Sequence, residues 1–200
     1  GTSAGLNRFD GREVSVYDRG NGLGGKPVDF ASSLVATPDG AVWIGAVSNG
    51  LFRRDSVTGQ FTSVEYSKDV ENKLAGRTPE SLAVDKKGYV WAALGDRGVD
   101  RVSPDGHLVV HWKPSLIREG APSSLIASAV TFDHQGGLWV AGGGGVSLYE
   151  PNSGATLSHF DLISGTPGPQ KWKLAVDSTR NVVWAIADGY GLWRLSRTGE

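Results

Sequence analysis

The chain has 200 residues, with 20 basic and 21 acidic side chains and a formal net charge of −1. Because both signs are mixed along the chain, the charge pattern favours neither nucleic acid nor an anionic membrane as a partner. The absence of cysteine excludes disulfides and thiolate metal sites, and no apolar run approaches the roughly 18 residues of a membrane span.

A short phrase recurs along the chain and predicts a repeat protein. It consists of a polar turn, a tryptophan between apolar residues, a glycine-rich gap, and then Gly followed by alternating residues. The tryptophans of its copies stand 48, 48 and 45 residues apart, at Trp43, Trp91, Trp139 and Trp184. The opening residues, GTSAGLNRFDG, match the second half of the phrase. Repetition at this period predicts one continuous architecture with a shared core.

The elements expected within each copy are short strands. In the first complete copy, four stretches are rich in Val, Trp, Phe and Tyr, at 34–36, 42–46, 51–54 and 60–66. They are separated by the turn sequences PDG, SNG and TG, which leave no room for a helix. Each copy is therefore expected to form a four-stranded antiparallel meander, and the chain an all-β propeller built of such blades.

The expected blades follow one another along a single propeller segment that spans residues 1–200. In chain order they are a partial blade at 1–17, blades at about 31–66, 80–112 and 125–160, and a partial blade at 172–200. Seventeen strands are one more than four blades require, so we expect an arc of a larger ring, with a closed four-bladed ring as the alternative. Since residue 1 falls inside a repeat and the chain has no Met, we also expect a piece of a longer protein.

The middle strand of each copy is apolar on both faces, as in AVWIGAV, YVWAAL, GLWVAGG and NVVWAIA. A blade packed between two others requires this pattern, whereas a strand of a two-sheet sandwich would have one polar face. We therefore interpret the repeated tryptophans as packing between blades and not as a ligand platform.

The repeated phrase resembles the two-component regulator propeller repeat. The resemblance rests on a fixed order of short features. Asp or Pro-Asp is followed by Gly, by a Trp between two apolar residues, and by small residues; Gly-Leu or Gly-Val then follows, with an Arg one or two positions later. The best matches are GTSAGLNRFDG and GAVSNGLFRRDSVTGQF, with Arg8 and Arg53, and the likeness weakens where Leu148 occupies the Arg position. Members of this family are extracytoplasmic sensor regions, typically with seven-bladed propellers, placed ahead of a membrane segment and a histidine kinase or diguanylate cyclase output.

The resemblance implies a periplasmic, ligand-sensing segment of a bacterial signal-transduction receptor. Its partners would be the remaining blades and the output domain of the parent chain, with no membrane contact by the segment itself. One rival is an enzyme of the streptogramin lyase type, which needs a His near a carboxylate and a metal at the channel mouth. A second rival is a protein-interaction scaffold, which needs an exposed aromatic or Arg cluster.

Residues suited to catalysis or metal binding are poorly placed in this sequence. Ser3 lies in a G-x-S-x-G pattern, but a strand-like GLNRF follows where a nucleophile elbow needs a helix. On a strand, His107 and His111 would lie about 13 Å apart, too far to share one ion. We therefore expect no catalytic residue, no metal and no cofactor.

A ligand site is expected on the loops at one end of the propeller channel. The turns between the second and third strands and the connections between blades gather there. The candidate binding residues are Asn49, Asp96, Arg97, Asp188, Tyr190 and Trp172, with Ser48, Arg77, Arg118 and Lys171 beside them. They suit a small polar ligand, for example a glycan fragment, or a docked partner.

Overall fold

The computed structural model describes residues 6–17, 31–67, 70–114, 126–164 and 170–198. Ser3 and Arg118 lie outside the described residues. Within them the chain forms seventeen β-strands, in the number expected from the repeats. No described helix is long and apolar enough to span a bilayer.

The strands fall into five antiparallel sheets. The first sheet has two strands, β1 (Leu6–Phe9) and β2 (Val14–Tyr17). The second has β3 (Ala31–Ala36), β4 (Val42–Ala46), β5 (Gly50–Arg54) and β6 (Phe61–Val64). The third has β7 (Ser81–Val84), β8 (Val90–Ala93), β9 (Val99–Val102) and β10 (Val109–Trp112). The fourth has β11 (Ala129–Phe132), β12 (Leu138–Gly142), β13 (Gly145–Tyr149) and β14 (Thr156–Asp161). The fifth has β15 (Trp172–Asp177), β16 (Val182–Ala187) and β17 (Gly191–Leu195).

Each sheet is a meander whose second strand carries the repeated tryptophan. Trp43 on β4 lies opposite Val35 on β3 and Arg53 on β5. The same register holds on β8, β12 and β16, for Trp91, Trp139 and Trp184. Tight turns set this register, and three of them use glycine with positive φ after a polar residue, at Gly40, Gly88 and Gly136.

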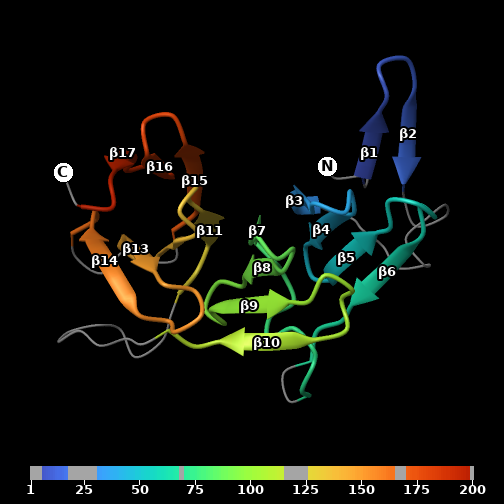
Figure 1. Cartoon of the computed structure of the whole chain (residues 1–200), viewed down its shortest axis with the longest axis horizontal. Helices are drawn as coiled ribbons and strands as arrows, with labels where there is room; N and C mark the ends of the chain where they lie inside the picture. The colour runs from blue at the N-terminus through green and yellow to red at the C-terminus, as the bar shows by residue number, and fades with distance from the viewer. Residues whose placement is uncertain (1–5, 18–30, 68–69, 115–125, 165–169, 199–200) are drawn as a thin grey trace.

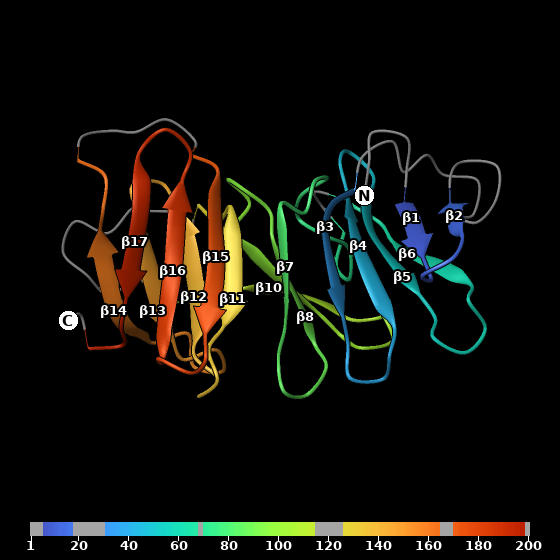
Figure 2. The same cartoon turned by 90° about the horizontal axis from the view of Figure 1, so that it is seen from above.

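The sheets are arranged as the blades of a propeller, which confirms the expected all-β class. The first strand of each blade lies innermost, since β3 contacts β7, β7 contacts β11, and β11 contacts β15. Figure 1 shows these strands near the centre, with β6, β10 and β14 at the outside. In Figure 2 the blades follow one another in chain order from the β1–β2 hairpin to β17.

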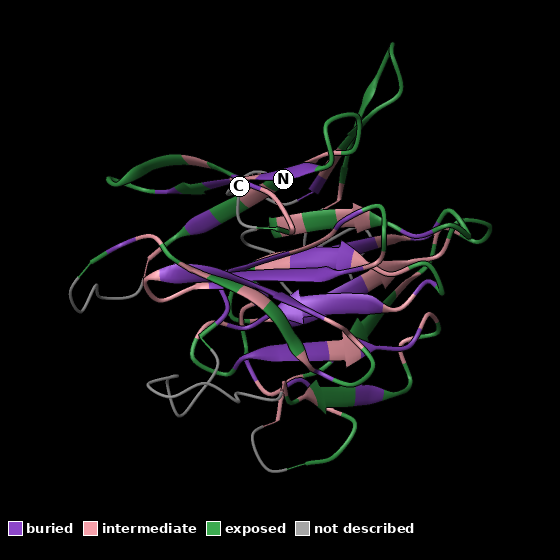
Figure 3. Cartoon of the chain, turned by 60° about the vertical axis from the view of Figure 1, so that its left-hand side comes forward, coloured by how far each residue is buried: buried purple, intermediate pink, exposed green. Residues whose placement is uncertain are grey.

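The core consists of layers between neighbouring blades, and three of the four repeated tryptophans lie in these layers. Trp43 packs with Leu51 of its own blade against Val90 and Val102 of the next blade. Trp91 and Trp139 occupy the same place in the next two layers. All three are at most 1% exposed. Figure 3 shows the buried central strands between more exposed outer strands, so the interpretation of these tryptophans as interblade packing is confirmed.

The β1–β2 hairpin covers the other face of the first complete blade. Leu6 packs against Ile44, Ala46 and Phe52, and the ring of Tyr17 lies 5.5 Å from that of Phe61. The hairpin therefore takes the place that the third and fourth strands of a preceding blade would occupy.

The last blade has one face that no described blade covers, which we call the free face. It carries Trp184, which is only half-buried, with Ile186 and Leu192, which are 45% and 62% exposed. Ile186 and Leu192 are cross-strand partners. In the earlier blades the face that carries the tryptophan packs on the following blade, so the free face corresponds to a surface that is buried between blades elsewhere in the molecule.

Candidate functional site

One end of the propeller carries a cleft of about 740 Å³, which we call the upper cleft. Its walls are the turn 94–97 between β8 and β9 and the connection 75–80 between β6 and β7. Tyr66, Ile126, Ser128 and Gln170 complete the lining. Turns between second and third strands and connections between blades therefore share this end of the molecule.

The upper cleft carries charges of both signs next to an aromatic ring. The Arg97 guanidinium lies 3.8 Å from the Asp96 carboxylate, and both side chains are well exposed. The Arg77 guanidinium lies over the Tyr66 ring at 5.9 Å. Desolvation raises the pKa of Glu80, the Lys171 ammonium opposes this rise, and the Asp96 carboxylate adds to it. Such a site can hydrogen-bond a polar ligand from several directions.

A buried carboxylate anchors the connection that forms one wall of the upper cleft. Asp100 on β9 is 0% exposed and accepts a hydrogen bond of 2.7 Å from the Ala75 backbone N–H. Its other oxygen lies 2.7 Å from His111 Nδ1 on β10. Burial raises the pKa of Asp100, and the bonds from Ala75 and His111 oppose the rise.

The same connection is also tied to the blade before it. The Ser48 N–H donates to Thr78 Oγ1 at 2.9 Å, and the Gly50 N–H donates to the Arg77 carbonyl at 2.8 Å. Ser48 has a positive φ of 63°, an uncommon conformation for a residue with a side chain. The wall 75–80 of the upper cleft is thus held by two neighbouring blades.

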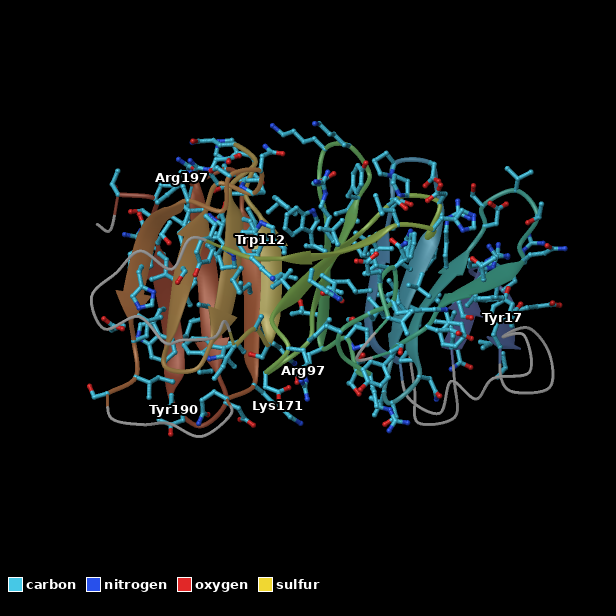
Figure 4. All side chains as sticks on the ribbon, turned by 90° about the horizontal axis from the view of Figure 1, so that it is seen from below. Tyr17, Arg97, Trp112, Lys171, Tyr190 and Arg197 are labelled. Atoms are coloured by element: carbon cyan, nitrogen blue, oxygen red, sulfur yellow. The ribbon has the colours of Figure 1, made fainter. Side chains whose placement is uncertain are left out.

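The candidate residues that lie on described loops fall into two groups, inside and outside the lining of the upper cleft. Asp96, Arg97 and Arg77 line the upper cleft. Asn49, Asp188, Tyr190 and Lys171 lie on loops of the same end but outside its lining. Figure 4 shows Arg97, Lys171 and Tyr190 along one edge of the molecule and Arg197 at the opposite edge.

Trp172 requires a correction, because it is not a loop residue. It is the first residue of β15, is 4% exposed, and packs in the layer between the last two blades. Its indole N–H donates to the Gly143 carbonyl at 3.2 Å, and its ring lies 5.5 Å from that of Trp193. Burial in the interblade layer removes it from the candidate ligand contacts.

A second cleft, of about 620 Å³, lies at the opposite end, and we call it the lower cleft. The turns that join first and second strands form its rim, with contributions from Lys86, Lys87, His134 and Ser178. The sequence contains these turns as DKKG, DHQG and DSTRN, which indicate strand ends and give no sign of a cleft.

An aspartate at the lower end organises one of these turns. Asp133 accepts hydrogen bonds from the Trp139 indole at 2.9 Å and from the Gly137 N–H at 2.9 Å. The Arg197 guanidinium binds both of its oxygens, at 2.8 and 3.1 Å. Burial raises the pKa of Asp133, but the bonds from Arg197, Trp139 and Gly137 outweigh it and leave the pKa below its ordinary value.

A Ser–His–Asp chain lies on the outer half of the third complete blade, and sequence reasoning missed it. Ser147 Oγ is 2.7 Å from His159 Nδ1, and His159 Nε2 is 2.9 Å from Asp161 Oδ1. Ser147 and His159 are cross-strand partners on β13 and β14, a pairing that only the register reveals.

This chain lacks the surroundings that acyl transfer needs. Ser147 is 8% exposed and sits in an interior strand paired on both sides, so the ladder uses the backbone N–H groups that an oxyanion hole would require. Burial raises the pKa of Tyr149, and a hydrogen bond with Ser147 opposes this. We interpret the chain as a polar link between strands.

Among the described residues, no group of three or more His, Cys, Asp or Glu side chains is arranged to hold a metal ion.

Solved structures share this fold. The extracellular domain of a protein assigned as a hybrid two-component system from B. thetaiotaomicron superposes on the whole chain with a TM-score of 0.67 at 23% identity. A gluconolactonase from Xanthomonas campestris matches 96% of the chain and 65% of its own length, with a TM-score of 0.64 at 18% identity. An inactive variant of virginiamycin B lyase from Staphylococcus aureus matches 92% of the chain and 59% of its own length, with a TM-score of 0.56 at 16% identity.

The chain spans about a quarter of the extracellular domain that it matches, since it covers 27% of that chain. No protein-family model and no curated protein sequence matches it. At these identities the likeness is one of fold, and it extends to sensor domains and to enzymes alike. The chain is thus a β-propeller that resembles the extracellular propeller domains of hybrid two-component systems.

Proposed function

We propose that this chain is a ligand-sensing, extracytoplasmic propeller segment of a bacterial signal-transduction receptor. It binds a small polar ligand in the upper cleft and relays occupancy to an output domain outside this chain, with no turnover of the ligand. The proposal includes a periplasmic location and further blades beyond the free face.

The observation that carries the proposal is that one wall of the upper cleft, the connection 75–80, is held by two neighbouring blades. Its wall 75–80 is anchored by Asp100 in one blade and by the turn at Ser48 in the blade before it. A ligand that contacts both this wall and Asp96 or Arg97 would bridge elements of neighbouring blades. Such a ligand stabilises one relative position of the blades, as a relay requires.

The chemistry of the upper cleft favours a ligand rich in hydroxyl groups, such as a glycan fragment. Arg77 and Arg97 offer donors, Glu80 and Asp96 offer acceptors, and the Tyr66 ring offers a flat apolar surface. Because both signs of charge are present, a strongly charged ligand of either sign would meet repulsion as well as attraction. The resemblance to sensor domains supports this choice over the lactonase and lyase activities named for other proteins of this fold.

A thermal-shift screen of neutral oligosaccharides and small anions against the 200-residue chain tests the proposal. A ligand that binds only the folded state raises the melting temperature according to its concentration relative to Kd. We expect the shift to be lost in Asp96→Ala and Arg97→Ala and kept in Asp188→Ala, an exposed residue on the equivalent turn of the last blade. A shift that survives both cleft substitutions would place the site elsewhere.

The same library tests for enzymatic activity. Incubation with each compound, with and without divalent metal ions, is followed by mass spectrometry of the products. We expect every compound to be recovered intact. Metal-dependent cleavage of any compound would favour a lyase-like or lactonase-like function instead.

A further inference from the structure

The lower cleft has an apolar floor made by the ends of the first strands. Because these strands lie side by side around the axis, their carboxyl ends converge at this end of the molecule. Ala36, Val84, Phe132 and Val176 come from β3, β7, β11 and β15 in turn, and all four line the cleft. The Phe132 ring packs edge-on against the Trp91 ring, with centroids 5.6 Å apart, so part of the floor is aromatic.

The rim of the lower cleft carries uncompensated positive charge. Its carboxylates already have partners, since Asp85 accepts from the Trp91 indole at 3.1 Å and Asp133 binds Arg197. Lys86, Lys87 and His134 also line the cleft and are exposed. Within the described part of the chain, none of these three has a recorded ion-pair partner. An anion at the rim would therefore face two ammonium groups without displacing an existing pair.

We propose that the lower cleft is a second binding site, which takes a small amphipathic anion: a carboxylate attached to a flat apolar group. The apolar group lies on the floor beside Phe132, and the carboxylate lies at the rim beside Lys86 and Lys87. A volume of about 620 Å³ is within the range of small-molecule sites. This site is separate from the upper cleft, so it does not depend on the function proposed there.

The two clefts differ in the ligand chemistry that they favour. The upper cleft is lined by both cations and carboxylates, whereas the carboxylates of the lower cleft already have partners and its lysines have none among the described residues. An aromatic carboxylate can contact both the apolar floor and the lysines of the rim. A neutral aromatic compound can contact only the floor, and acetate can contact only the rim.

Isothermal titration of the 200-residue chain with 2-naphthoate tests the proposal. We expect saturable binding of one molecule, with weaker binding of the neutral analogue 2-naphthalenemethanol and none of acetate. The double variant Lys86→Gln/Lys87→Gln should bind 2-naphthoate roughly fivefold more weakly, as expected for two exposed charge contacts, and bind the neutral analogue unchanged. Ala36→Trp, at an exposed position on the floor, should block both aromatic compounds.

Three control variants locate the binding. Lys113→Gln/Lys173→Gln makes the same change in charge at exposed positions outside the cleft and should leave the affinity unchanged. Ile186→Gln/Leu192→Gln removes apolar groups of the free face and should have no effect. Asp96→Ala alters the upper cleft and should also have no effect, which separates this test from that of the proposed function.

The proposal is overturned by any of three results. The first is no binding of 2-naphthoate at millimolar concentration. The second is equal affinity for 2-naphthoate in the Lys86→Gln/Lys87→Gln variant and the unmodified chain. The third is loss of binding in the free-face variant, which would show that the compound adheres to the uncovered blade.

Discussion

Arg197, two residues beyond the last strand, forms a two-pronged ion pair with Asp133 of the preceding blade. In the preceding repeat the residue opposite the tryptophan supplies the guanidinium, since Arg101 approaches Asp85 to 3.8 Å. The third repeat has Leu148 at that position. A guanidinium from the next blade therefore pairs with Asp133 in the place where the preceding repeat uses its own arginine.

We predict that Arg197→Ala lowers the free energy of unfolding by about 2–3 kcal/mol, because it leaves the buried Asp133 carboxylate without its charged partner. Urea denaturation measures the change. Arg194→Ala, at an exposed position on the free face, is the matched control and should change the stability by less than about 0.5 kcal/mol.

Leu148→Arg should rescue the Arg197→Ala variant, because it restores an arginine opposite Trp139 as in the earlier repeats. In the presence of Arg197 the same substitution should destabilise the chain, since two guanidinium groups then compete for one carboxylate. A double-mutant cycle measures the coupling energy between positions 148 and 197, which should be clearly different from zero. Additive losses from the two substitutions would contradict the exchange of roles.

The indole N–H groups of the tryptophans should differ in their contribution to stability. Trp139 donates to Asp133, whereas the Trp43 Nε1 is buried without a recorded partner because Thr37 stands in the equivalent place. We predict that Trp139→Phe costs about 1–2 kcal/mol more than Trp43→Phe, since only the first leaves a buried acceptor short of a donor. Paired denaturation curves measure the difference. Equal losses of stability in the two variants would mean that the hydrogen bond from Trp139 to Asp133 makes no net contribution to stability.

Much of the fold was predictable because the repeat is local and periodic. The strand that carries Trp43 was expected at 42–46 and is found at Val42–Ala46. The order of strands in each sheet follows from the tight turns and from the middle strands that are apolar on both faces. These two features can be recognised within a single repeat. The register that places Trp43, Trp91 and Trp139 in interblade layers follows from the same pattern.

The sites were less predictable because they depend on contacts between repeats. Leu148 was recognisable as a departure from the repeat. The ion pair between Arg197 and Asp133 joins residues 64 positions apart, and nothing in the sequence indicates it. Trp172 follows a loop-like stretch rich in Gly and Pro, so the sequence favoured a loop residue over the start of a strand. The lower cleft arises only where the ends of four strands meet.

Acid should weaken the chain partly through Asp133. Its pKa is lowered in the folded state, so its contribution to stability is present above the ordinary value of 3.8 and is lost as the pH falls through the folded value. We predict that the stability difference between the unmodified chain and Asp133→Asn is largest near neutral pH and shrinks below about pH 4. Denaturation at several pH values measures it. A difference independent of pH would contradict this account.

The free face of the last blade should promote self-association. Ile186 and Leu192 are exposed there beside the half-buried Trp184. Repeat proteins need a polar outer face on their terminal repeats to stay soluble, so an uncovered apolar blade surface favours association. We predict that Ile186→Gln/Leu192→Gln reduces association in sedimentation velocity runs. Leu157→Gln, at an exposed position on an outer strand, is the control. A monodisperse, cooperatively melting monomer of the unmodified chain would instead support a closed small ring.

Ser147 should be unreactive despite its hydrogen bond to His159. We predict no labelling by a fluorophosphonate probe at neutral pH, because Ser147 is buried and its strand is paired on both sides. Mass spectrometry of tryptic peptides reads the result. Labelling that disappears in His159→Gln would show an activated nucleophile and reopen the question of catalysis.

The buried Asp100 has a consequence for how quickly the upper cleft can be filled. By holding the Ala75 N–H from inside the second complete blade, it fixes the wall of the cleft before any ligand arrives. A preorganised wall needs little ordering on association, so entry should be limited by diffusion and orientation and not by a slow rearrangement. Association rates should then rise in proportion to ligand concentration without reaching a plateau.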